Sequence, residues 1–322
     1  MCSKMHKNGG KMKYIRGVVF SNTYAGSYSN DAAKTSLIEM KKQSACNTVV
    51  FVISAIQECA KESKIDYKHI YMPKDQDIVD IIGFAKEIGL QTILKPEIIC
   101  MDGQSQTEIA KCHEGESEDS FWFQEYRQYI MHYAEVAAKV DCDMLIIGCE
   151  LVELEKKELY WRDLICNIRE IYPGYLTYNA NRCKEENVIW WDALDYISAN
   201  GFYKNNELPI QIQRIDEIQK KYNKPFFFSE IGCKSCQGAS DEPGNWRRQG
   251  KVDLNEQANY LDQFLTTCKT SENLSGMVVY NWWEDNKACS DVYSNDSYNI
   301  YGKPACDVIK SKWQEADKND YI

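Results

Sequence analysis

The sequence predicts an α/β protein that forms a single (β/α)₈ barrel, or TIM barrel. Eight apolar runs of strand length recur along the 322 residues, and helical patterns separate most of them. Alternating strands and helices are typical of a parallel sheet, and eight such units favour closure into a barrel. A doubly wound open sheet is the alternative, but no glycine-rich phosphate loop follows any run, which argues against its nucleotide-binding form.

The predicted strands are rich in Ile, Val, Leu and Phe, the residues that suit a buried parallel strand. No linker or change of composition divides the series, so one domain is expected. The eight strands are predicted at residues 14–20, 47–54, 91–97, 144–150, 175–179, 196–202, 225–230 and 276–282.

The predicted helices carry apolar residues at helical spacing. The helix at 75–88 has acidic residues in its first turn and Gly89 directly after it, as the helix dipole and the C-terminal cap favour. Residues 98–119 are expected to form a long acidic loop. The helices are predicted at residues 31–43, 75–88, 121–139, 156–171, 209–222, 254–270 and 304–313, with a brief helical turn at 190–194.

The composition narrows the range of partners and compartments. A net charge of −10 repels polyanions, so neither nucleic acid nor an anionic membrane surface is expected as a partner. Residues 1–13 are polar and carry four lysines, which predicts a flexible tail before the domain at 14–322 rather than a secretory signal. The 14 cysteines are scattered, several inside predicted strands or helices, as is typical of small buried residues in a reducing compartment. A cytoplasmic protein is therefore expected.

Two predicted strands end in a glutamate. Glu150 closes the run at 144–150, and Glu230 closes the run at 225–230. In a (β/α)₈ barrel the working groups lie at this end of the strands, so we expect both carboxylates at one mouth of the barrel. Cleavage of a glycosidic bond requires such a pair, one to protonate the leaving oxygen and one to attack the anomeric carbon. The alternative for each glutamate is an ordinary solvated strand end.

Two aromatic residues at strand ends are candidates for contacts at the same mouth. Tyr203 ends the sixth strand, beside the strand of Glu230, where its hydroxyl could orient that carboxylate; a solvated hydroxyl is the alternative. Trp282 closes the eighth strand, with Tyr280 on the same face by the two-residue period, and Trp283 on the other. An indole there offers a flat surface on which a sugar ring can stack. The alternative is that Trp282 only packs over the top of the hydrophobic core.

Six polar side chains are weaker candidates for sugar binding. Lys95 and Glu97 end the third strand, where they could hydrogen bond sugar hydroxyls or form a surface pair. The other four, in or near the ends of strands and the loops after them, are Asn22, Tyr24, Tyr178 and Asn181.

Other chemistries find little support. Cys233 and Cys236 form a lone CxxC without a second pair, and the four histidines lack the spacing of a metal motif. Two loop thiols are the simpler interpretation, and no metal or other cofactor is expected. No GxSxG elbow is present, so a serine hydrolase is not supported.

Five segments together resemble a known family. They are Ile147-Gly148-Cys149-Glu150, Tyr160-Trp161-Arg162-Asp163-Leu164-Ile165, Leu176-Thr177-Tyr178-Asn179, Phe228-Ser229-Glu230-Ile231-Gly232-Cys233-Lys234-Ser235 and Tyr301-Gly302-Lys303-Pro304-Ala305. The series resembles glycoside hydrolase family 113, of clan A of the (β/α)₈ retaining glycosidases. The resemblance spans about residues 14–313, and the segment at 228–235 and the Gly-Lys-Pro-Ala turn are its more specific parts.

The resemblance implies a retaining, endo-acting β-1,4-mannanase whose catalytic domain is 14–322. It makes Glu150 the acid/base, Glu230 the nucleophile, Tyr203 the partner of that nucleophile and Trp282 the platform under the sugar at the cleavage site. It implies an oligosaccharide or polysaccharide substrate and no cofactor.

Cys149 departs from the clan pattern. Most clan A enzymes place Asn just before the acid/base, where it touches the sugar 2-hydroxyl, and a thiol is a weak donor. The acid/base assignment is unaffected, but another β-linked glycan, for example one containing glucosamine, becomes an alternative to mannan. A carbohydrate-binding barrel without activity is a second alternative, and a metal-dependent barrel hydrolase is a third.

Overall fold

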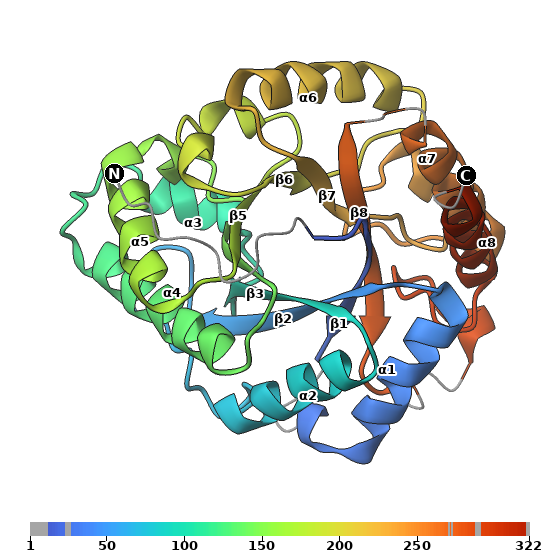
Figure 1. The fold of residues 1–322 in the computed structure, drawn as a ribbon, viewed down its shortest axis with the longest axis horizontal. Coiled ribbons are helices and arrows are strands. Elements are labelled where there is room, and N and C mark those ends of the chain that lie inside the picture. Colours follow the sequence, from blue (N-terminus) through green and yellow to red (C-terminus); the bar gives the residue numbers. More distant parts are fainter. Residues whose placement is uncertain (1–11, 23–26, 270, 272, 287–290, 320–322) are drawn as a thin grey trace.

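The computed structural model describes residues 12–22, 27–269, 271, 273–286 and 291–319. Eight parallel strands pair in sequence order and close into the ring seen in Figure 1, which confirms the predicted (β/α)₈ barrel. The strands are β1 (Ile15–Ser21), β2 (Thr48–Gln57), β3 (Gln91–Cys100), β4 (Met144–Cys149), β5 (Tyr175–Ala180), β6 (Ile197–Asn200), β7 (Phe226–Ile231) and β8 (Leu274–Trp283).

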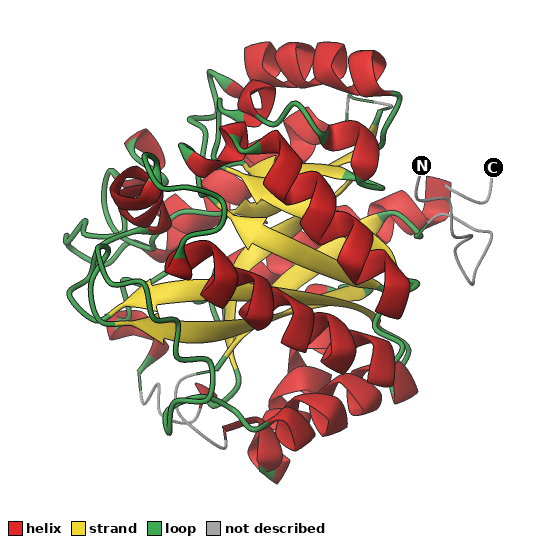
Figure 2. Ribbon diagram, turned by 90° about the vertical axis from the view of Figure 1, so that its left-hand side faces the viewer, coloured by secondary structure: helices red, strands yellow, loops and turns green. Residues whose placement is uncertain are grey.

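Helices surround the strands on the outside of the barrel, as Figure 2 shows from the side. Between β5 and β6 the described chain forms only short 3₁₀ turns, one of them at the predicted turn, Trp191–Ala193. The helices are α1 (Asp31–Ser44), α2 (Asp75–Glu87), α3 (Gln106–His113), α4 (Phe121–Lys139), α5 (Glu158–Ile171), α6 (Leu208–Tyr222), α7 (Leu254–Cys268) and α8 (Pro304–Asn319).

Helix α3 corrects the prediction of a continuous loop at 98–119. The Ser105 backbone N–H donates to Glu108 Oε2 at 2.7 Å, and the serine and glutamate side chains form a capping box at the start of the helix. This local signal supplies partners for the first free N–H groups of the helix. It outweighs the polar composition of the segment on which the loop prediction was based.

The core has an inner and an outer part. Side chains from alternate positions, such as Val19, Val50 and Ile146, fill the lower interior of the barrel. The intervening positions, such as Phe20, Phe51 and Ile147, face the helices and belong to the larger outer cluster. This alternation is the expected packing of a barrel whose interior is filled by side chains rather than open.

The interior becomes polar toward the carboxyl ends of the strands. The Asn179 amide donates to Asn200 Oδ1 at 3.0 Å, and the Thr177 hydroxyl lies 3.2 Å from that of Ser198. Lys95 is also buried at this level. Buried polar groups are tolerated when they are hydrogen bonded, and their concentration at this end places the chemistry of the barrel here.

Three strands carry one extra residue at this polar end. In β4 the pairing advances by three positions, from Ile146 to Cys149, where β5 advances by two. In β7 the pairing skips from Phe228 to Glu230 against adjacent residues of β6, and in β8 an extra residue precedes Trp282 opposite β1. Such bulges turn side chains away from the regular alternation and are common beside active sites.

The segment before β1 is described only from Met12. Its backbone N–H donates to the Tyr196 hydroxyl at 3.2 Å, and that of Lys13 donates to Gln91 Oε1 at 2.9 Å. The rest of the predicted tail, residues 1–11, lies outside the described residues. None of the described helices is both long and apolar enough to span a membrane.

Candidate active site

Glu230 is buried at the end of β7 and contacts Lys95 from β3. Its side chain is 7% exposed, and Lys95 Nζ donates to its Oε1 in a close contact. The same ammonium lies 3.3 Å from Glu97 Oε2, so one buried cation stands between two carboxylates. Because β3 and β7 lie on different sides of the ring, closure of the barrel is what creates this contact.

Burial and neighbouring charges set the protonation of this group. Burial raises the pKa of Glu230 to about 7; Lys95 opposes the rise, and the charges of Glu97 and Glu150 add to it. For Lys95 burial lowers the pKa, but neighbouring acidic groups, the carboxylates of Glu230 and Glu97 among them, raise it overall, so the amine stays charged. Glu230 therefore ionises near neutral pH beside a permanent cation.

Glu150 lies directly after β4 in a different environment. The Asn200 amide of β6 donates to its Oε1 at 2.6 Å. Burial raises the pKa of Glu150 above the usual value, although this hydrogen bond works in the opposite direction. Both glutamates therefore have raised pKa values, and they differ in the partner that opposes the rise, the Asn200 amide for Glu150 and the Lys95 ammonium for Glu230.

Asn200 links the two glutamates through β6. Its side chain bonds Glu150, and its backbone pairs with Glu230 in the sheet. Asn179 of β5 extends the link, because its amide donates to Asn200 Oδ1 and to Cys149 Sγ, at 3.0 and 3.1 Å, and its Oδ1 accepts from the Ser229 hydroxyl. The sequence reasoning missed both asparagines; an amide at an inward position of a buried strand was the available signal.

Cys149 is a neutral member of this hydrogen-bonded layer. Burial raises the pKa of the thiol well above its usual value, so the sulfur remains protonated at neutral pH. Its Sγ accepts the hydrogen bond from Asn179, at the position where the clan pattern places an amide.

The structure corrects the predicted position of Tyr203. Its ring belongs to the outer cluster, and its hydroxyl donates to Glu185 Oε1 at 3.2 Å and accepts from the Cys183 N–H at 3.1 Å. Tyr203 thus lies behind β6 and is not the hydrogen-bond partner of Glu230. Lys95 occupies that place, and the residue of β6 that faces the site is Asn200.

The predicted platform at Trp282 is also corrected. Trp282 is fully buried in the outer cluster, and its indole N–H donates to Ser36 Oγ of α1 at 2.8 Å. The extra residue in β8 reverses the alternation, so Tyr280 and Trp282 do not share a face. Tyr280 packs against the inner cluster, and its pKa is raised by burial and by the charges of Glu230 and Glu97.

Tyr178 is buried behind β5 and does not line a binding loop. Its hydroxyl donates to Glu155 Oε1 at 3.0 Å. Asn22 and Asn181 are half-buried directly after β1 and β5, and sugar binding by them stays a prediction. Tyr24 lies outside the described residues.

A cluster of aromatic rings lies next to Tyr280. Trp246, on the loop after β7, has its ring centroid 4.9 Å from that of Tyr280 and 4.2 Å from that of Tyr298. Trp246 is 49% exposed, whereas Tyr298 is buried. The sequence reasoning missed Trp246, because nothing local distinguishes an exposed indole in a long polar loop.

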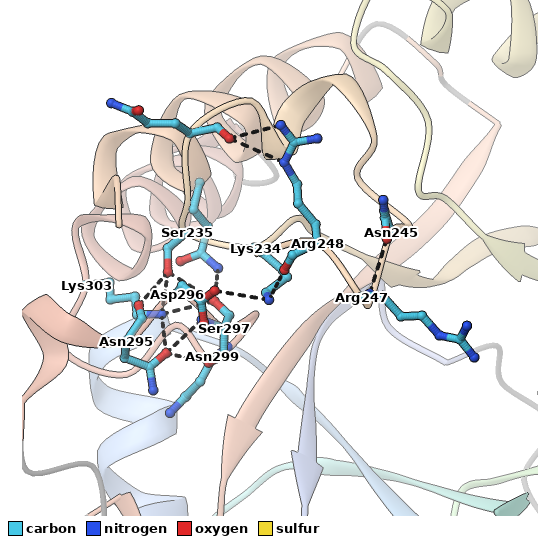
Figure 3. Close-up of polar contacts among 12 residues, drawn as sticks. Lys234, Ser235, Asn245, Arg247, Arg248, Asn295, Asp296, Ser297, Asn299 and Lys303 are labelled. Carbon is cyan, nitrogen blue, oxygen red and sulfur yellow. Dashed lines mark hydrogen bonds and ion pairs between the residues drawn. The ribbon is translucent and has the colours of Figure 1, made fainter. Parts of the chain in front are cut away.

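The loops after β7 and β8 are joined by the polar contacts of Figure 3. The buried Lys303 ammonium donates to Ser235 Oγ at 2.8 Å, to Asn295 Oδ1 at 3.1 Å and to the Ser297 carbonyl at 3.1 Å. Lys303 belongs to the Gly-Lys-Pro-Ala turn, and Ser235 follows Glu230 by five residues. The turn thus fixes the loop that leaves the strand of Glu230.

Comparison with known proteins identifies the family. The model of Glycoside Hydrolase Family 113 matches residues 19–303. The chain belongs to glycoside hydrolase family 113. The family resemblance seen in the sequence is confirmed, and the protein is a glycoside hydrolase of this family.

Solved structures of family 113 are similar over nearly the whole hydrolase. Two described as GH113 β-1,4-mannanases are 36% and 34% identical, cover 94% of this chain and 99% of their own, and give TM-scores of 0.88 and 0.87. The β-mannanase AaManA from Alicyclobacillus acidocaldarius, in complex with ManMIm, is 30% identical over 94% of this chain and 98% of its own, with a TM-score of 0.87. No curated protein sequence gives a significant match.

More distant structures share the fold alone. The β-glucuronidase of Ruminococcus gnavus is 14% identical with a TM-score of 0.62, and this chain covers half of its length. Within the described part of the hydrolase, no group of three or more His, Cys, Asp or Glu side chains is arranged to hold a metal ion.

We predict that Lys95→Met and Glu97→Gln shift the pH dependence of this family 113 hydrolase in opposite directions. Loss of the cation raises the pKa of Glu230, so ionisation needs a higher pH and the acidic limb of kcat/KM moves upward; loss of the Glu97 charge moves it downward. The measurement is kcat/KM from pH 4 to 9 for both variants. Shifts of the same sign would contradict the arrangement of charges around Glu230.

We predict that Lys303→Met lowers the free energy of unfolding by about 2 kcal/mol, because three buried acceptors lose a shared donor. Denaturant unfolding followed by tryptophan fluorescence measures the change. Lys220→Met is the matched control, since that lysine is exposed and pairs only with its helix neighbour Glu217 among the described contacts. Equal stability of both variants would show that Lys303 does not secure the loops.

Proposed function

We propose that this hydrolase cleaves β-1,4-linked mannan, glucomannan or manno-oligosaccharides, in endo mode and with retention of anomeric configuration. The observation that carries the proposal is that two strand-end carboxyls, Glu150 and Glu230, share one hydrogen-bonded layer but have different partners, an amide and an ammonium. The similarity to family 113 β-1,4-mannanases supports mannan as the substrate.

The environments of the carboxyls support a double displacement. Glu230, ionised beside Lys95, attacks the anomeric carbon while protonated Glu150 gives its proton to the leaving oxygen, and the glycosidic bond breaks. The product of this step is a glycosyl ester of Glu230. Glu150, now ionised, takes a proton from water, the resulting hydroxide attacks the anomeric carbon, and the ester bond to Glu230 breaks. Glu150 is again protonated and Glu230 is again ionised.

Cys149 favours a second class of substrate, a β-linked glycan with an amino sugar, as the alternative to mannan. The position usually occupied by an amide that touches the sugar 2-hydroxyl holds a thiol, which is a weak hydrogen-bond donor. A β-linked glycan with a different group at carbon 2, such as an amino sugar, is therefore the alternative substrate. Comparing mannan with chitosan oligosaccharides distinguishes the two.

Alanine substitution of either carboxyl tests the mechanism. Glu150→Ala and Glu230→Ala are each expected to lower turnover of mannan or glucomannan by at least about 10³-fold, which corresponds to ~4 kcal/mol of barrier. Reducing-sugar release measures this, and Glu217→Ala, an exposed glutamate on α6, is the control. If the wild type cleaves a β-glycan and neither alanine variant is slower, the assignment is wrong. If the wild type binds oligosaccharide without forming product, the protein is a binding barrel instead.

Trp246 is the best-placed ring for sugar stacking. Half of it is exposed, it follows the strand of Glu230, and it contacts Tyr280, whose pKa responds to the Glu230 charge. Flat aromatic faces bind the apolar faces of small ligands. We assign to Trp246 the platform role that the sequence had given to Trp282.

We expect Trp246→Ala to raise KM for manno-oligosaccharides by about 10-fold with a smaller change in kcat, since roughly 1.4 kcal/mol of stacking is lost from ground state and transition state alike. Trp246→Phe keeps a ring and is expected to retain most of the affinity. Steady-state kinetics on mannotetraose measures both. An unchanged KM in the alanine variant would remove Trp246 from the binding surface.

The cysteines support the proposed cytoplasmic location. None of the twelve cysteines that the structure describes is part of a disulfide, and most are buried, among them both members of the CxxC pair. Free buried thiols are typical of proteins from reducing compartments.

A further inference from the structure

Tyr178 lies directly behind the loop that carries Glu150. Its hydroxyl accepts a hydrogen bond from the backbone N–H of Leu151, the residue after Glu150, at 2.8 Å. Its ring lies against Gly148, where an added Cβ would come within 2.8 Å of Tyr178 Cε2. One side chain therefore contacts the backbone on both sides of Glu150.

The backbone at Glu150 needs such support. Its φ of 52° lies in the left-handed region, which is unfavourable for residues other than glycine by roughly 1–2 kcal/mol. Two consecutive N–H groups, those of Glu150 and Leu151, bond to β5, the first to the Asn179 carbonyl at 2.9 Å and the second to the Tyr178 hydroxyl. Strained conformations persist only where surrounding contacts determine them.

Glu155 fixes the direction of the Tyr178 hydroxyl. The hydroxyl donates its single proton to Glu155 Oε1 at 3.0 Å, which leaves its lone pairs for the Leu151 N–H. Glu155 is fully buried, and its own carbonyl accepts from the Trp190 indole at 2.9 Å. The rings of Trp190 and Trp161 stack with their centroids 4.9 Å apart, and both contact the Tyr178 ring and hold it in place.

We propose that Tyr178, oriented by Glu155, is a positioning residue for the acid/base Glu150. The inference rests on the hydrolysis proposed above and adds a group that does not touch substrate. Without the hydroxyl, the Leu151 N–H loses its acceptor, the turn at Glu150 relaxes, and the carboxyl no longer meets the leaving oxygen. Placement errors of about 1 Å cost up to ~10²-fold in rate.

A comparison of leaving groups separates positioning from a merely structural role. A sugar leaving group needs protonation, whereas a dinitrophenolate leaves without it. For Tyr178→Phe we expect kcat/KM on mannotetraose to fall about 10- to 100-fold. On 2,4-dinitrophenyl β-mannobioside, where glycosylation needs no general acid, the fall is expected to stay within about 3-fold.

Tyr172→Phe is the matched control. The Tyr172 hydroxyl is equally buried and donates to the Cys142 carbonyl at 2.8 Å, before β4 at the other end of the barrel. This variant also loses a buried hydroxyl, but both substrates should be affected equally. If Tyr178→Phe does not fold, Glu155→Leu removes the orienting acceptor instead and is expected to show the same dependence on leaving group.

The outcomes distinguish failure of the positioning role of Tyr178 from failure of the proposed hydrolytic function. An active wild type whose Tyr178→Phe and Tyr172→Phe variants show the same ratio between the two substrates overturns the positioning role alone. A wild type that cleaves neither substrate overturns the proposed function and this inference with it. A selective loss on mannotetraose, confined to Tyr178 and Glu155 variants, supports the assignment.

Discussion

The site depends on one extra residue at the carboxyl end of each of three strands. A regular strand alternates its side chains, so neighbouring residues cannot both face the interior. The bulge in β7 lets Ser229 and Glu230 both do so, since one bonds Asn179 and the other Lys95. The bulge in β4 precedes Glu150 in its left-handed conformation. The bulges in β7 and β4 thus direct the Glu230 and Glu150 carboxyls toward the mouth of the barrel.

Electrostatics then separates two chemically identical side chains. The lower barrel is apolar and the upper layer polar, so both carboxyls are desolvated and both have raised pKa values. Glu230 is next to the Lys95 cation, whereas Glu150 accepts from the neutral Asn200 amide. A cation stabilises the ionised form of its neighbour, and an amide does so less. In the mechanism that we propose, the carboxyl beside the cation is the nucleophile and the carboxyl beside the amide is the acid.

Contacts outside the barrel support the groups inside it. Tyr178 and Glu155 hold the turn at Glu150 from behind β5, and Lys303 ties the loop after Glu230 to the loop after β8. Both supports use buried hydrogen bonds among residues far apart in the chain. The geometry at the mouth therefore depends on packing between the strands and the helical layer. For this reason substitutions outside the mouth are expected to change catalysis or stability.

The sequence by itself determined the strand order, most helices, the two terminal glutamates and the family, because apolar period, caps and short motifs are local properties. The tertiary structure decided which faces these residues present. Trp282 proved to be an outer packing residue, because a bulge in β8 reverses the alternation of side chains. Tyr203, in the loop after β6, also packs outside, and closure of the ring brings Lys95 of β3 to Glu230 in its place. The side of the sheet that a side chain faces, and the distant residue that it contacts, depend on the register of the closed sheet, which no local sequence pattern encodes.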